Sequence, residues 1–352
     1  MIEPSVDFDV LVAGGGPVGL GVALMAARAG FATAVVERRT DPVDKACGEG
    51  LMPGALATLL ALGVDPPGHA FHGIRYVDAR TGRSAEARFA AGPGRGVRRT
   101  ALHGTLAAAV DAAGVKRLSG TVDDVRQLDG AVSVGASAAG GLRARWLVAA
   151  DGLHSTVRAE LGLGAAPRVR PRYGLRQHFA AAPWSDCVEV HWADGAEAYV
   201  TPVGEGVVGV AVLTDRRGPS HADWLRRFPA LTDRLRDAPP ASEVRGAGPL
   251  EQNVSRRVAG RVLLVGDASG YVDALTGEGI AVGLAQAEVL VRCLATGRPE
   301  DYERAWLTVS RRYRVLTRAV LAAAQRPRVR QLLVPAAAAL PPVFGVAVNA
   351  LA

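Results

Sequence analysis

The chain has 352 residues, of which 49% are hydrophobic and 21% charged, so its composition excludes a mostly disordered protein and its length allows two or three domains. The formal charge is +7, and 39 of the 41 basic residues are arginine. These arginines are scattered and only 5% of the residues are aromatic, which argues against a protein that binds nucleic acid. The surplus of arginine reflects either a compositional bias or an attractive field for an anionic ligand.

The three cysteines are far apart and form no CxxC pair, which predicts a protein of a reducing, cytoplasmic compartment. The amino terminus lacks the basic region of a signal peptide. Prolines interrupt the apolar segment from Leu332 to Ala352, which disfavours a membrane-spanning helix but leaves peripheral contact of this segment with a membrane open. The neighbouring His69 and His72 lack a third ligand, so no metal site is predicted.

A strand, helix and second strand are predicted in the first forty residues. The apolar run from Val10 to Ala13 predicts a buried strand, and the segment from Leu20 to Ala29 predicts a helix that stops at Gly30. The run from Thr33 to Val36 predicts the second strand. This order is typical of the first unit of a dinucleotide-binding domain.

A GxGxxG motif lies between the first strand and the helix. Gly14 permits a tight turn, Gly16 lets the backbone approach a pyrophosphate, and Gly19 lets the helix pack closely on the strand. Glu37 ends the second strand, where it can accept hydrogen bonds from both ribose hydroxyls and would repel a 2′-phosphate. The segment therefore predicts FAD or NAD rather than NADP. The residues predicted to bind the cofactor here are Gly14, Gly16, Pro17, Val18, Gly19, Glu37 and Arg38.

A second match to the same motif runs from Gly204 to Gly209. The strand-like Val210 to Leu213 follows it, and the helix that a phosphate site requires is missing. We therefore predict a hairpin turn between two strands at this position.

Two later apolar runs, Trp146 to Ala150 and Val262 to Val265, also predict strands. Asp151-Gly152 follows the first and Gly266-Asp267 the second, at the strand ends where open α/β sheets bind ligands. Either acid alone could be a helix cap. Together with the glycine-rich turn, the three strand ends are predicted to converge on one long ligand.

These three motifs resemble those of the FAD-dependent monooxygenases and oxidoreductases with the p-hydroxybenzoate hydroxylase fold, over essentially the whole chain. The resemblance implies a Rossmann-type α/β FAD-binding domain, an interleaved antiparallel-sheet substrate domain, and C-terminal helices. It also implies FAD as the cofactor and NAD(P)H as a transient reductant without a domain of its own. The residues that it adds to the cofactor site are Arg99, Val122, Asp151, Gly152, Arg158, Gly266 and Asp267.

Two segments, Lys45 to Leu51 and Gly266 to Ile280, resemble the geranylgeranyl-reductase-related branch of this family, which also contains hydroxylases and relatives of halogenases. The sequence lacks the Trp-x-Trp motif of tryptophan halogenases, which disfavours halogenation. The stretch from Ala198 to Pro202 lacks the Trp and Phe of the reductases, which argues against prenyl reduction. The resemblance places these residues near the flavin ring: Cys47, Gly48, Gly277, Gly279 and Ile280.

The resemblance also predicts the domain boundaries. The FAD-binding domain comprises residues 1–70, 96–165 and 250–298, the substrate domain residues 71–95 and 166–249, and a helical segment residues 299–352. Helices are predicted over residues 223–235, 281–294 and 302–324, and substrate-domain strands over residues 73–89, 173–179, 188–192, 198–203 and 207–213.

Four residues are candidates for catalysis: His178, Arg176, Tyr199 and Cys47. Hydroxylation by such an enzyme uses a flavin C4a-hydroperoxide and a substrate phenol activated by a nearby histidine, tyrosine or arginine. Strand alternation puts Arg176 and His178 on one face, which is either pocket or solvent, and Cys47 is either a contact to flavin or substrate or a small packed residue. Glu278 is predicted to be a capping or surface acid rather than a catalyst.

The sequence therefore predicts an NAD(P)H-dependent FAD monooxygenase of secondary metabolism that uses O₂ to hydroxylate a small aromatic or polyketide-like molecule. One alternative is a flavin-dependent reductase of isoprenoid or other C=C bonds. A second is a cyclase-like flavoprotein whose reaction is redox-neutral. The partner is predicted to be a small-molecule substrate, and its identity and the oligomeric state stay open.

Overall fold

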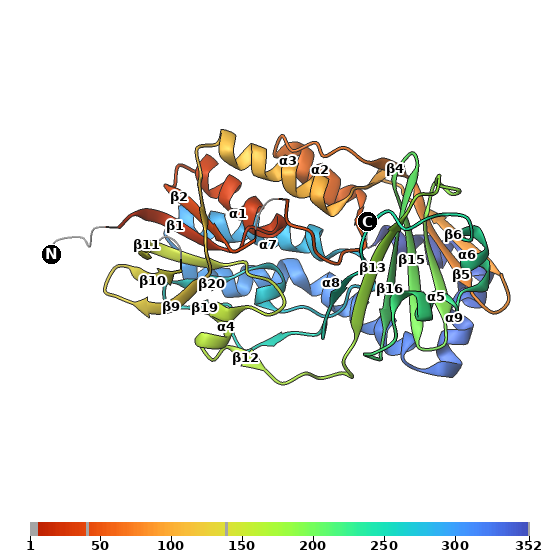
Figure 1. Cartoon of the computed structure of the whole chain (residues 1–352). Helices are drawn as coiled ribbons and strands as arrows, with labels where there is room; N and C mark the ends of the chain where they lie inside the picture. Colours follow the sequence, from red (N-terminus) through yellow and green to blue (C-terminus); the bar gives the residue numbers. More distant parts are fainter. Residues whose placement is uncertain (1–5, 40–41, 138–139, 351–352) are drawn as a thin grey trace.

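Two large β-sheets lie at opposite ends of the molecule in Figure 1, with helices packed along both. The structure, a computed structural model, describes residues 6–39, 42–137 and 140–350. Its mixed α/β architecture confirms the predicted fold class. The predicted domain boundaries stay a prediction, although the strands of the first sheet do come from three separate stretches of the chain.

The first sheet has eight strands, with the path β19-β20-β11-β1-β2-β8 and a β9-β10 hairpin attached to β11. The strands from β20 to β8 are parallel, and β19 and the hairpin are antiparallel. The bounds are β1 (Phe8–Ala13), β2 (Thr33–Glu37), β8 (Lys116–Ser119), β9 (Val122–Gln127), β10 (Val132–Ala136), β11 (Gly140–Ala149), β19 (Val258–Ala259) and β20 (Val262–Leu264).

Both faces of this sheet are covered, which explains why its central strands are almost continuously apolar. Val10 and Val12 of β1 pack toward α1 (Pro17–Arg28), α3 (Arg99–Ala112) and α7 (Gly279–Ala295). Leu11 and Ala13 alternate with them and pack on the other face, against residues of the β9-β10 hairpin. The strands and the helix predicted for the first forty residues are confirmed, with each end at or within three residues of the predicted one.

The second sheet has seven strands in the order β17-β13-β16-β15-β14-β5-β6, antiparallel except for the parallel pair β14 and β5. The predicted hairpin turn is confirmed, since Gly204 and Val207 are opposite each other across Glu205-Gly206. The bounds are β5 (Gly73–Asp78), β6 (Ser84–Arg88), β13 (Tyr173–Phe179), β14 (Val188–Ala193), β15 (Ala196–Gly204), β16 (Val207–Thr214) and β17 (Arg245–Ala247).

A three-stranded sheet of β3 (Gly50–Leu51), β4 (His69–Phe71) and β7 (Gly94–Gly96) connects the two large sheets. A Cβ on Gly96 would lie 1.7 Å from the carbonyl oxygen of Pro202 in β15, so only glycine permits this approach. The remaining short elements are β12 (Gly164–Ala165), β18 (Asn253–Val254), α2 (Pro53–Ala61), α4 (Thr156–Glu160) and two 3-10 helices, Gly266–Ser269 and Pro299–Asp301.

The helix predicted over residues 223–235 is wrong as a single element. Two short helices, α5 (His221–Leu225) and α6 (Pro229–Arg234), occupy the segment. Pro229 has no N–H to continue the first helix, and the residue before it, Phe228, leaves the helical region with φ −123° and ψ 73°. Trp224 of α5, Phe228 between the helices and Leu231 of α6 pack on the outer face of the second sheet.

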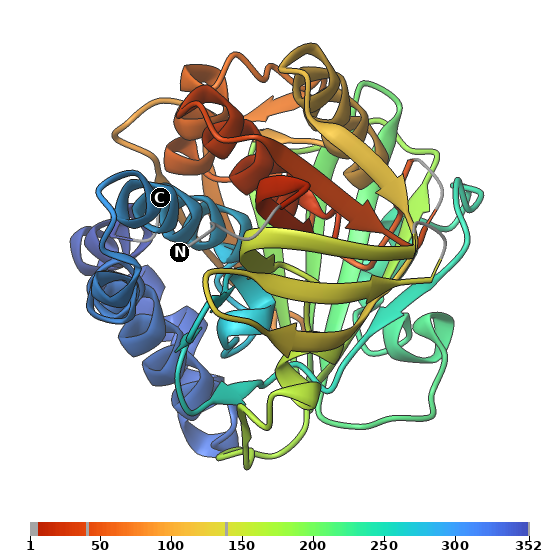
Figure 2. The same ribbon diagram turned by 90° about the vertical axis from the view of Figure 1, so that its left-hand side faces the viewer.

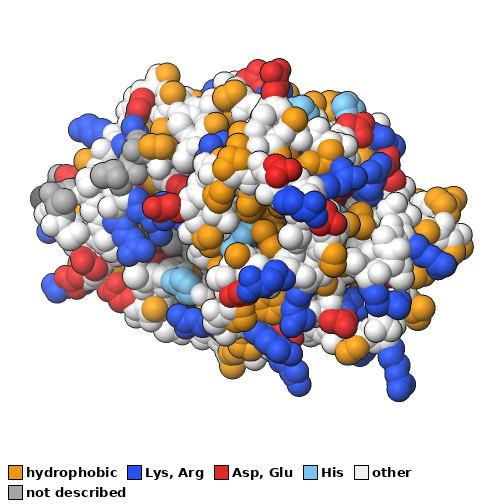
Figure 3. Space-filling model, turned by 45° about the vertical axis from the view of Figure 1, so that its right-hand side comes forward, with side chains coloured by type: hydrophobic (Ala, Val, Ile, Leu, Met, Phe, Trp, Pro, Cys, Tyr) orange, Lys and Arg blue, Asp and Glu red, His pale blue; other side chains and the backbone are white. Residues whose placement is uncertain are grey.

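Three helices end the chain: α8 (Tyr302–Ala324), as predicted, then α9 (Pro327–Ala339) and α10 (Pro341–Asn349). Figure 2 shows them, in blue, along one side of the molecule. In the described residues no single helix has the length and apolar composition to cross a membrane, whereas α9 and α10 pass that test together and are bent by 104° at their junction. The face in Figure 3 shows Lys and Arg side chains interspersed with acidic and apolar ones.

Candidate active site

The ends of three neighbouring strands line one cavity. β20, β11 and β1 are adjacent in the first sheet, and the loops after them contribute Gly266-Asp267, Gly152 and Gly16 to the cavity wall. The cavity has a volume of about 250 Å³ and extends to the inner face of the second sheet. The structure thus brings together the three motifs that the sequence singled out, at the strand ends where α/β sheets bind ligands.

Two glycines of the GxGxxG motif are required by geometry. Gly14 has φ +102°, and a Cβ there would lie 2.6 Å from the carbonyl oxygen of Ala150. A Cβ on Gly19 would lie 1.9 Å from the oxygen of Gly14, so helix α1 could not pack this closely on β1 with any other residue. Gly16 precedes α1, and no side chain caps this helix end, which leaves its N–H groups facing the cavity side.

Glu37 is fixed by the backbone at the end of β2. Its Oε2 accepts a hydrogen bond from Gly15 N at 2.8 Å, and its Oε1 accepts one from Arg39 N at 3.0 Å. The carboxylate therefore stands beside the glycine turn, where a ribose would reach it. Arg38, next to it, is exposed. Contact of either side chain with the cofactor stays a prediction.

Basic groups gather beside the glycine turn. Nε of Arg99 is buried and has no partner in the described part of the chain, and its Nη2 lies 3.7 Å from the Cβ position of Gly16. Lys45 lines the same cavity, and burial lowers the pKa of its ammonium group, an effect that the charge of Asp267 opposes. Two cations at an open helix N-terminus fit the pyrophosphate of a dinucleotide.

Asp151, Arg158 and Val122 lie away from the cavity wall. Oδ2 of Asp151 accepts hydrogen bonds from Thr156 Oγ1 and Val157 N, while its buried Oδ1 has no partner among the described residues. The Arg158 guanidinium donates to the carbonyls of Leu153 and Ala268, so it ties the loop after β11 to the loop after β20. Arg158 would therefore act on the cofactor indirectly, by holding these two loops in place. Val122 is buried within β9.

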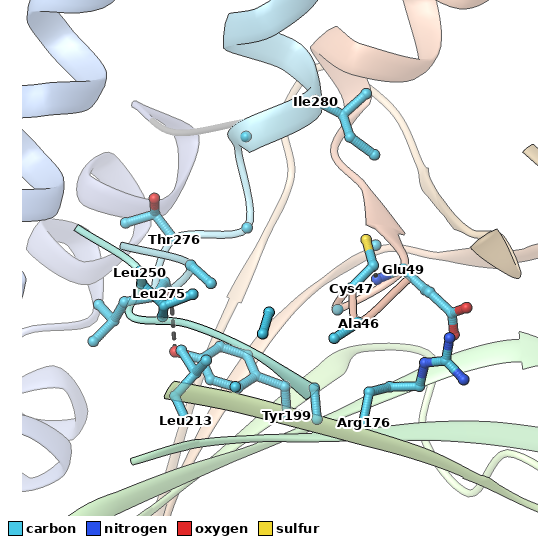
Figure 4. A pocket seen from close by; sticks show the side chains of 18 of the residues that line it. Ala46, Cys47, Glu49, Arg176, Tyr199, Leu213, Leu250, Leu275, Thr276 and Ile280 are labelled. Carbon is cyan, nitrogen blue, oxygen red and sulfur yellow. Dashed lines mark hydrogen bonds between the residues drawn. The ribbon is translucent and has the colours of Figure 1, made fainter. Parts of the chain in front are cut away.

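The residues expected near the flavin ring line the other part of the cavity: Cys47, Gly48, Gly277, Gly279 and Ile280. Figure 4 shows the Cys47 sulfur pointing toward the start of α7, where Ile280 lies. Helix α7 begins at Gly279, after Gly277 with φ +71°. The helix N-terminus that the resemblance implies is therefore at the cavity.

Glu278 corrects a sequence expectation. It stands before α7, but its side chain makes no capping hydrogen bond, and its Oε2 is buried without a partner in the described residues. Burial raises the pKa of Glu278 to about 8, although the charge of Arg312 opposes this shift. It is neither a cap nor a surface acid, because its side chain makes no hydrogen bond to the helix end and its Oε2 is buried.

Glu49 joins three of the site segments through a buried network. This residue has φ +60°, its Oε1 accepts from Arg99 N at 2.7 Å, and its Oε2 lies 2.6 Å from Nε2 of His178. Nδ1 of His178 lies 3.1 Å from Nη1 of Arg176. A guanidinium only donates and a carboxylate oxygen only accepts, so Nδ1 is the acceptor from Arg176 and Nε2 the donor to Glu49.

The four catalytic candidates occupy different positions. Arg176, Tyr199 and Cys47 line the cavity, whereas His178 lies behind Glu49 with 1% of its surface exposed. The Arg176 guanidinium pairs with Asp44, and it contacts a different ring nitrogen of His178 from the one that the Glu49 carboxylate contacts. The predicted shared face of Arg176 and His178 is an inward face, but only Arg176 reaches the cavity.

An apolar wall covers the rest of the cavity, and sequence reasoning did not identify it. Tyr199 lies within it, where its hydroxyl donates to the Leu275 carbonyl at 2.8 Å and burial holds its pKa well above the ordinary value. Strand alternation was the available signal, but it does not say which face meets a ligand. The wall consists of Ile74, Tyr76, Phe89, Val188, Val190, Ala211, Leu213, Leu250, Leu275 and Val348.

Comparisons with known proteins agree with this site. A family model described as an FAD binding domain matches residues 7–308. Menaquinone reductase of Mycolicibacterium smegmatis is 29% identical over 329 residues, which cover 86% of this chain and 80% of that protein. Digeranylgeranylglycerophospholipid reductase 1 of Methanothermobacter thermautotrophicus is 28% identical over 307 residues, covering 81% and 76%.

Solved structures show the same fold. A flavoprotein/dehydrogenase from Cytophaga hutchinsonii superposes with a TM-score of 0.79 at 18% identity, covering 97% of this chain and 96% of that one. A halogenase in complex with phloroglucinol and FAD superposes with a TM-score of 0.72 at 16% identity, covering 87% and 73%. The predicted fold, cofactor and branch are thereby confirmed. The chain belongs to the FAD-binding domain family, and it is an FAD-dependent oxidoreductase of the geranylgeranyl-reductase-related branch.

Proposed function

We propose that this protein is a reductase that saturates a carbon–carbon double bond in an isoprenoid chain, with NAD(P)H as the electron donor. The single observation that carries the proposal is the apolar wall opposite the glycine motifs. An isoprenoid chain offers only apolar surface for recognition, and a wall of aliphatic and aromatic side chains suits it. The relatives that match most of the chain bear the names of reductases of isoprenoid-bearing lipids, which supports this choice over hydroxylation.

The wall can hold an apolar substrate without leaving the Tyr199 hydroxyl short of a hydrogen-bond partner. Tyr76 and Tyr199 bring the two hydroxyls of this wall, and that of Tyr199 is already hydrogen-bonded to the Leu275 carbonyl. A tyrosine whose pKa is raised keeps its proton, so Tyr199 adds an aromatic surface rather than a charge. The substrate chain would therefore bind by shape and exclusion of water.

The reduction adds two electrons and two protons across the double bond. The cavity beside Gly16 and Gly277 would hold FAD, which, once reduced by NAD(P)H, would supply a hydride (both electrons and one proton) to one carbon. In this proposal the thiol of Cys47 gives the second carbon its proton and regains one from solvent. Cys47 lies where the glycine loop meets the cavity, and Glu49 N donates to its sulfur at 3.4 Å, which fixes the thiol within the loop.

The buried network behind the loop would keep Cys47 in place. Glu49 receives hydrogen bonds from Arg99 N and from His178, and Thr201 Oγ1 donates to the Gly48 carbonyl at 2.8 Å. These bonds tie the 47–49 loop to α3, β13 and β15. In this proposal His178 is a positioning residue, because it acts on the site through Glu49.

Hydroxylation of an aromatic ring is the second candidate. Para-nitrophenol 4-monooxygenase of a Pseudomonas species is 32% identical over 193 residues, although these cover only 49% of this chain. Arg176 reaches the cavity and could stabilise a phenolate there. Its guanidinium is already paired with Asp44, which weakens this second candidate relative to the first.

The two candidates differ in their need for oxygen. The FAD-loaded enzyme should be incubated under nitrogen with dithionite or NADPH and a geranylgeranyl lipid. The expected product is heavier by two hydrogens for each saturated bond, as seen by mass spectrometry. A product that forms only with oxygen and is heavier by one oxygen atom would support hydroxylation instead, and an isomer of unchanged mass would support the redox-neutral alternative.

A further inference from the structure

The outer face of the C-terminal helix pair α9 and α10 is apolar. Leu332, Leu340, Val343 and Val346 are exposed by 61%, 56%, 62% and 72% of their surface. In a water-facing helix such positions carry polar residues. Among the large hydrophobic side chains exposed in the described part of the chain, half lie between Val329 and Val346.

The inner face of α10 is apolar too, and it is buried. Phe344 packs against Tyr76 with ring centroids 4.8 Å apart, and Val348 contributes to the cavity wall. Asn349 fixes the end of the helix, since its side chain accepts from Ala90 N at 2.7 Å and donates to the Arg88 carbonyl at 3.0 Å. α10 is thus a firmly attached helix with apolar residues on both sides, one side lining the site and the other facing outward.

The positive charge of the protein belongs to this end of the chain. From Arg304 onward the sequence has eight arginines and no aspartate or glutamate. The preceding residues contain 33 basic and 34 acidic side chains, so the surplus of +7 arises entirely from the last 49 residues. Five of these arginines lie in α8 and Arg330 pairs with Asp194, so Arg326 and Arg328 are the charges next to the apolar face of α9 and α10 that pair with no acid among the described residues. An apolar face bordered by positive charge matches the surface of an anionic membrane.

Arginines flank the apolar face at both ends. Arg326 and Arg328 are exposed at the start of α9. Arg312 of α8 is also exposed, and its Nη2 donates to the Asn349 carbonyl at 3.5 Å, which places it at the end of α10. Charges in these positions could reach lipid phosphates while the valines and leucines between them enter the apolar layer.

We infer that the outer face of α9 and α10 docks on a bilayer that contains anionic phospholipid, and that a lipid substrate passes from the bilayer into the cavity beside α10. The inference deepens the proposed function, on which its second half rests, because isoprenoid lipids reside in membranes. Its first half, docking on the bilayer, stands on the surface alone and is tested without turnover.

Vesicle sedimentation of the FAD-loaded enzyme tests the docking. Vesicles of phosphatidylcholine with phosphatidylglycerol are compared with vesicles of phosphatidylcholine alone, at low and high salt. The double variant Val343→Asp/Val346→Asp should bind the mixed vesicles at least about tenfold more weakly than the wild type. Arg326→Gln/Arg328→Gln should lower the preference for anionic vesicles and its salt dependence. Leu128→Asp, at an exposed leucine distant in sequence from these helices, is the matched control and should bind normally.

The enzyme's activity separates the two halves of the inference. The Val343→Asp/Val346→Asp variant should turn over a detergent-dispersed isoprenoid like the wild type and lose activity on the same lipid in vesicles. Failure of the wild type to bind mixed vesicles, or equal binding by the variant, would overturn the docking. A concentration-dependent dimer that the variant abolishes, without vesicle binding, would assign the face to a second copy of the chain. Vesicle binding without any reduction would leave the docking intact and overturn the proposed function.

Discussion

Two of the cysteines lie in contrasting surroundings. Cys47 lines the cavity in the loop before β3, whereas Cys187 is buried outside it, where burial raises its pKa to about 12. A thiol with such a raised pKa is inert at neutral pH. The pair therefore provides a cavity thiol and a core thiol in the same chain.

Replacing Cys47 tests its proposed role as proton donor. Cys47→Ala should keep FAD and leave the rate of flavin reduction by NAD(P)H unchanged, while product formation falls about 100-fold, as for loss of a general acid. Anaerobic flavin absorbance and product mass spectrometry measure the two steps separately. Cys187→Ala is the control and should turn over normally. If Cys47→Ala formed product at the wild-type rate, the thiol would be a packing residue only.

Glu37 should control retention of the cofactor. Its carboxylate is held by Gly15 N and Arg39 N at the end of β2, where an arginine would remove the acceptor for the ribose hydroxyls. We expect Glu37→Arg to raise the Kd for FAD at least about tenfold, since each lost factor of ten needs only about 1.4 kcal/mol. The FAD-to-protein ratio after gel filtration measures this. Glu205→Arg, in the exposed hairpin turn, controls for the change of charge, and equal retention in both variants would reject the ribose role.

At the scale of the element, the strand–turn–helix unit requires a positive φ at its glycine turn as well as room for close packing there. Gly14 has φ +102° and also abuts the Ala150 carbonyl, whereas Gly30 at the end of α1 has φ +88° and open space around it. Gly14→Ala should therefore destabilise the protein by about 2 kcal/mol or more, through strain and a clash together, and Gly30→Ala by about 1 kcal/mol, through strain alone. Urea unfolding of both variants measures the difference. Equal losses of unfolding free energy would show that the backbone at Ala150 shifts to accommodate the added methyl group.

The start of α7 should make stability depend on pH. Burial raises the pKa of Glu278 from an ordinary 4.5 to about 8, so the folded protein holds a proton that the unfolded chain has lost. Stability should then fall as the pH rises through this window, because the folded state binds more protons than the unfolded state.

Glu278→Gln keeps the shape of the side chain and removes the titration. Its urea midpoint should exceed that of the FAD-loaded wild type by an amount that grows between about pH 5 and pH 9. Glu288→Gln, at an exposed position of α7, is the control and should parallel the wild type. Parallel curves for Glu278→Gln would mean that its carboxyl is not protonated in the folded protein.

At the scale of the whole molecule, a buried ion cluster joins the second sheet to the loop before α7. Arg172 donates to Glu197 of β15 at 2.7 Å and to Asp273 at 2.9 Å. Burial raises the pKa of Asp273 to about 6, although the charge of Arg172 opposes this shift. The negative charge of Glu197, which pairs with the same arginine, raises the pKa of Asp273 further. The Arg172 guanidinium thus attaches the loop after Asp273 to the sheet, together with the hydrogen bond from Tyr199 to the Leu275 carbonyl.

Removing that guanidinium would leave two carboxylates buried without their partner. Arg172→Met should cost about 3–5 kcal/mol of unfolding free energy and weaken FAD retention, because the loop carries Gly277 and Gly279. Denaturant unfolding and FAD titration measure both effects. Arg226→Met breaks an exposed pair with Asp223 and should change stability by less than about 1 kcal/mol. Comparable losses in the two variants would contradict the structural role of the cluster.

The sequence by itself determined the strand–turn–helix unit proposed to hold FAD, because such a turn is built from contiguous residues. Gly14, Gly19 and Glu37 lie within one strand–helix–strand unit, so their spacing already specifies the turn, the close packing and the acid at the strand end. The two later motifs could be placed as well, since parallel strands end at one edge of a sheet. The extent of a helix was harder to predict where a proline interrupts the segment, as Pro229 does between α5 and α6.

Only the tertiary structure decided what lies opposite that site. Glu49 meets His178 across 129 positions of the chain, and the apolar wall takes residues from strands, loops and helix α10 between Ile74 and Val348. Strand alternation divides such residues into two faces but does not say which face is inward, so His178 could not be separated from Arg176. The chemistry of the cofactor is therefore local in the sequence, whereas the choice of substrate rests on side chains that only the folded chain assembles.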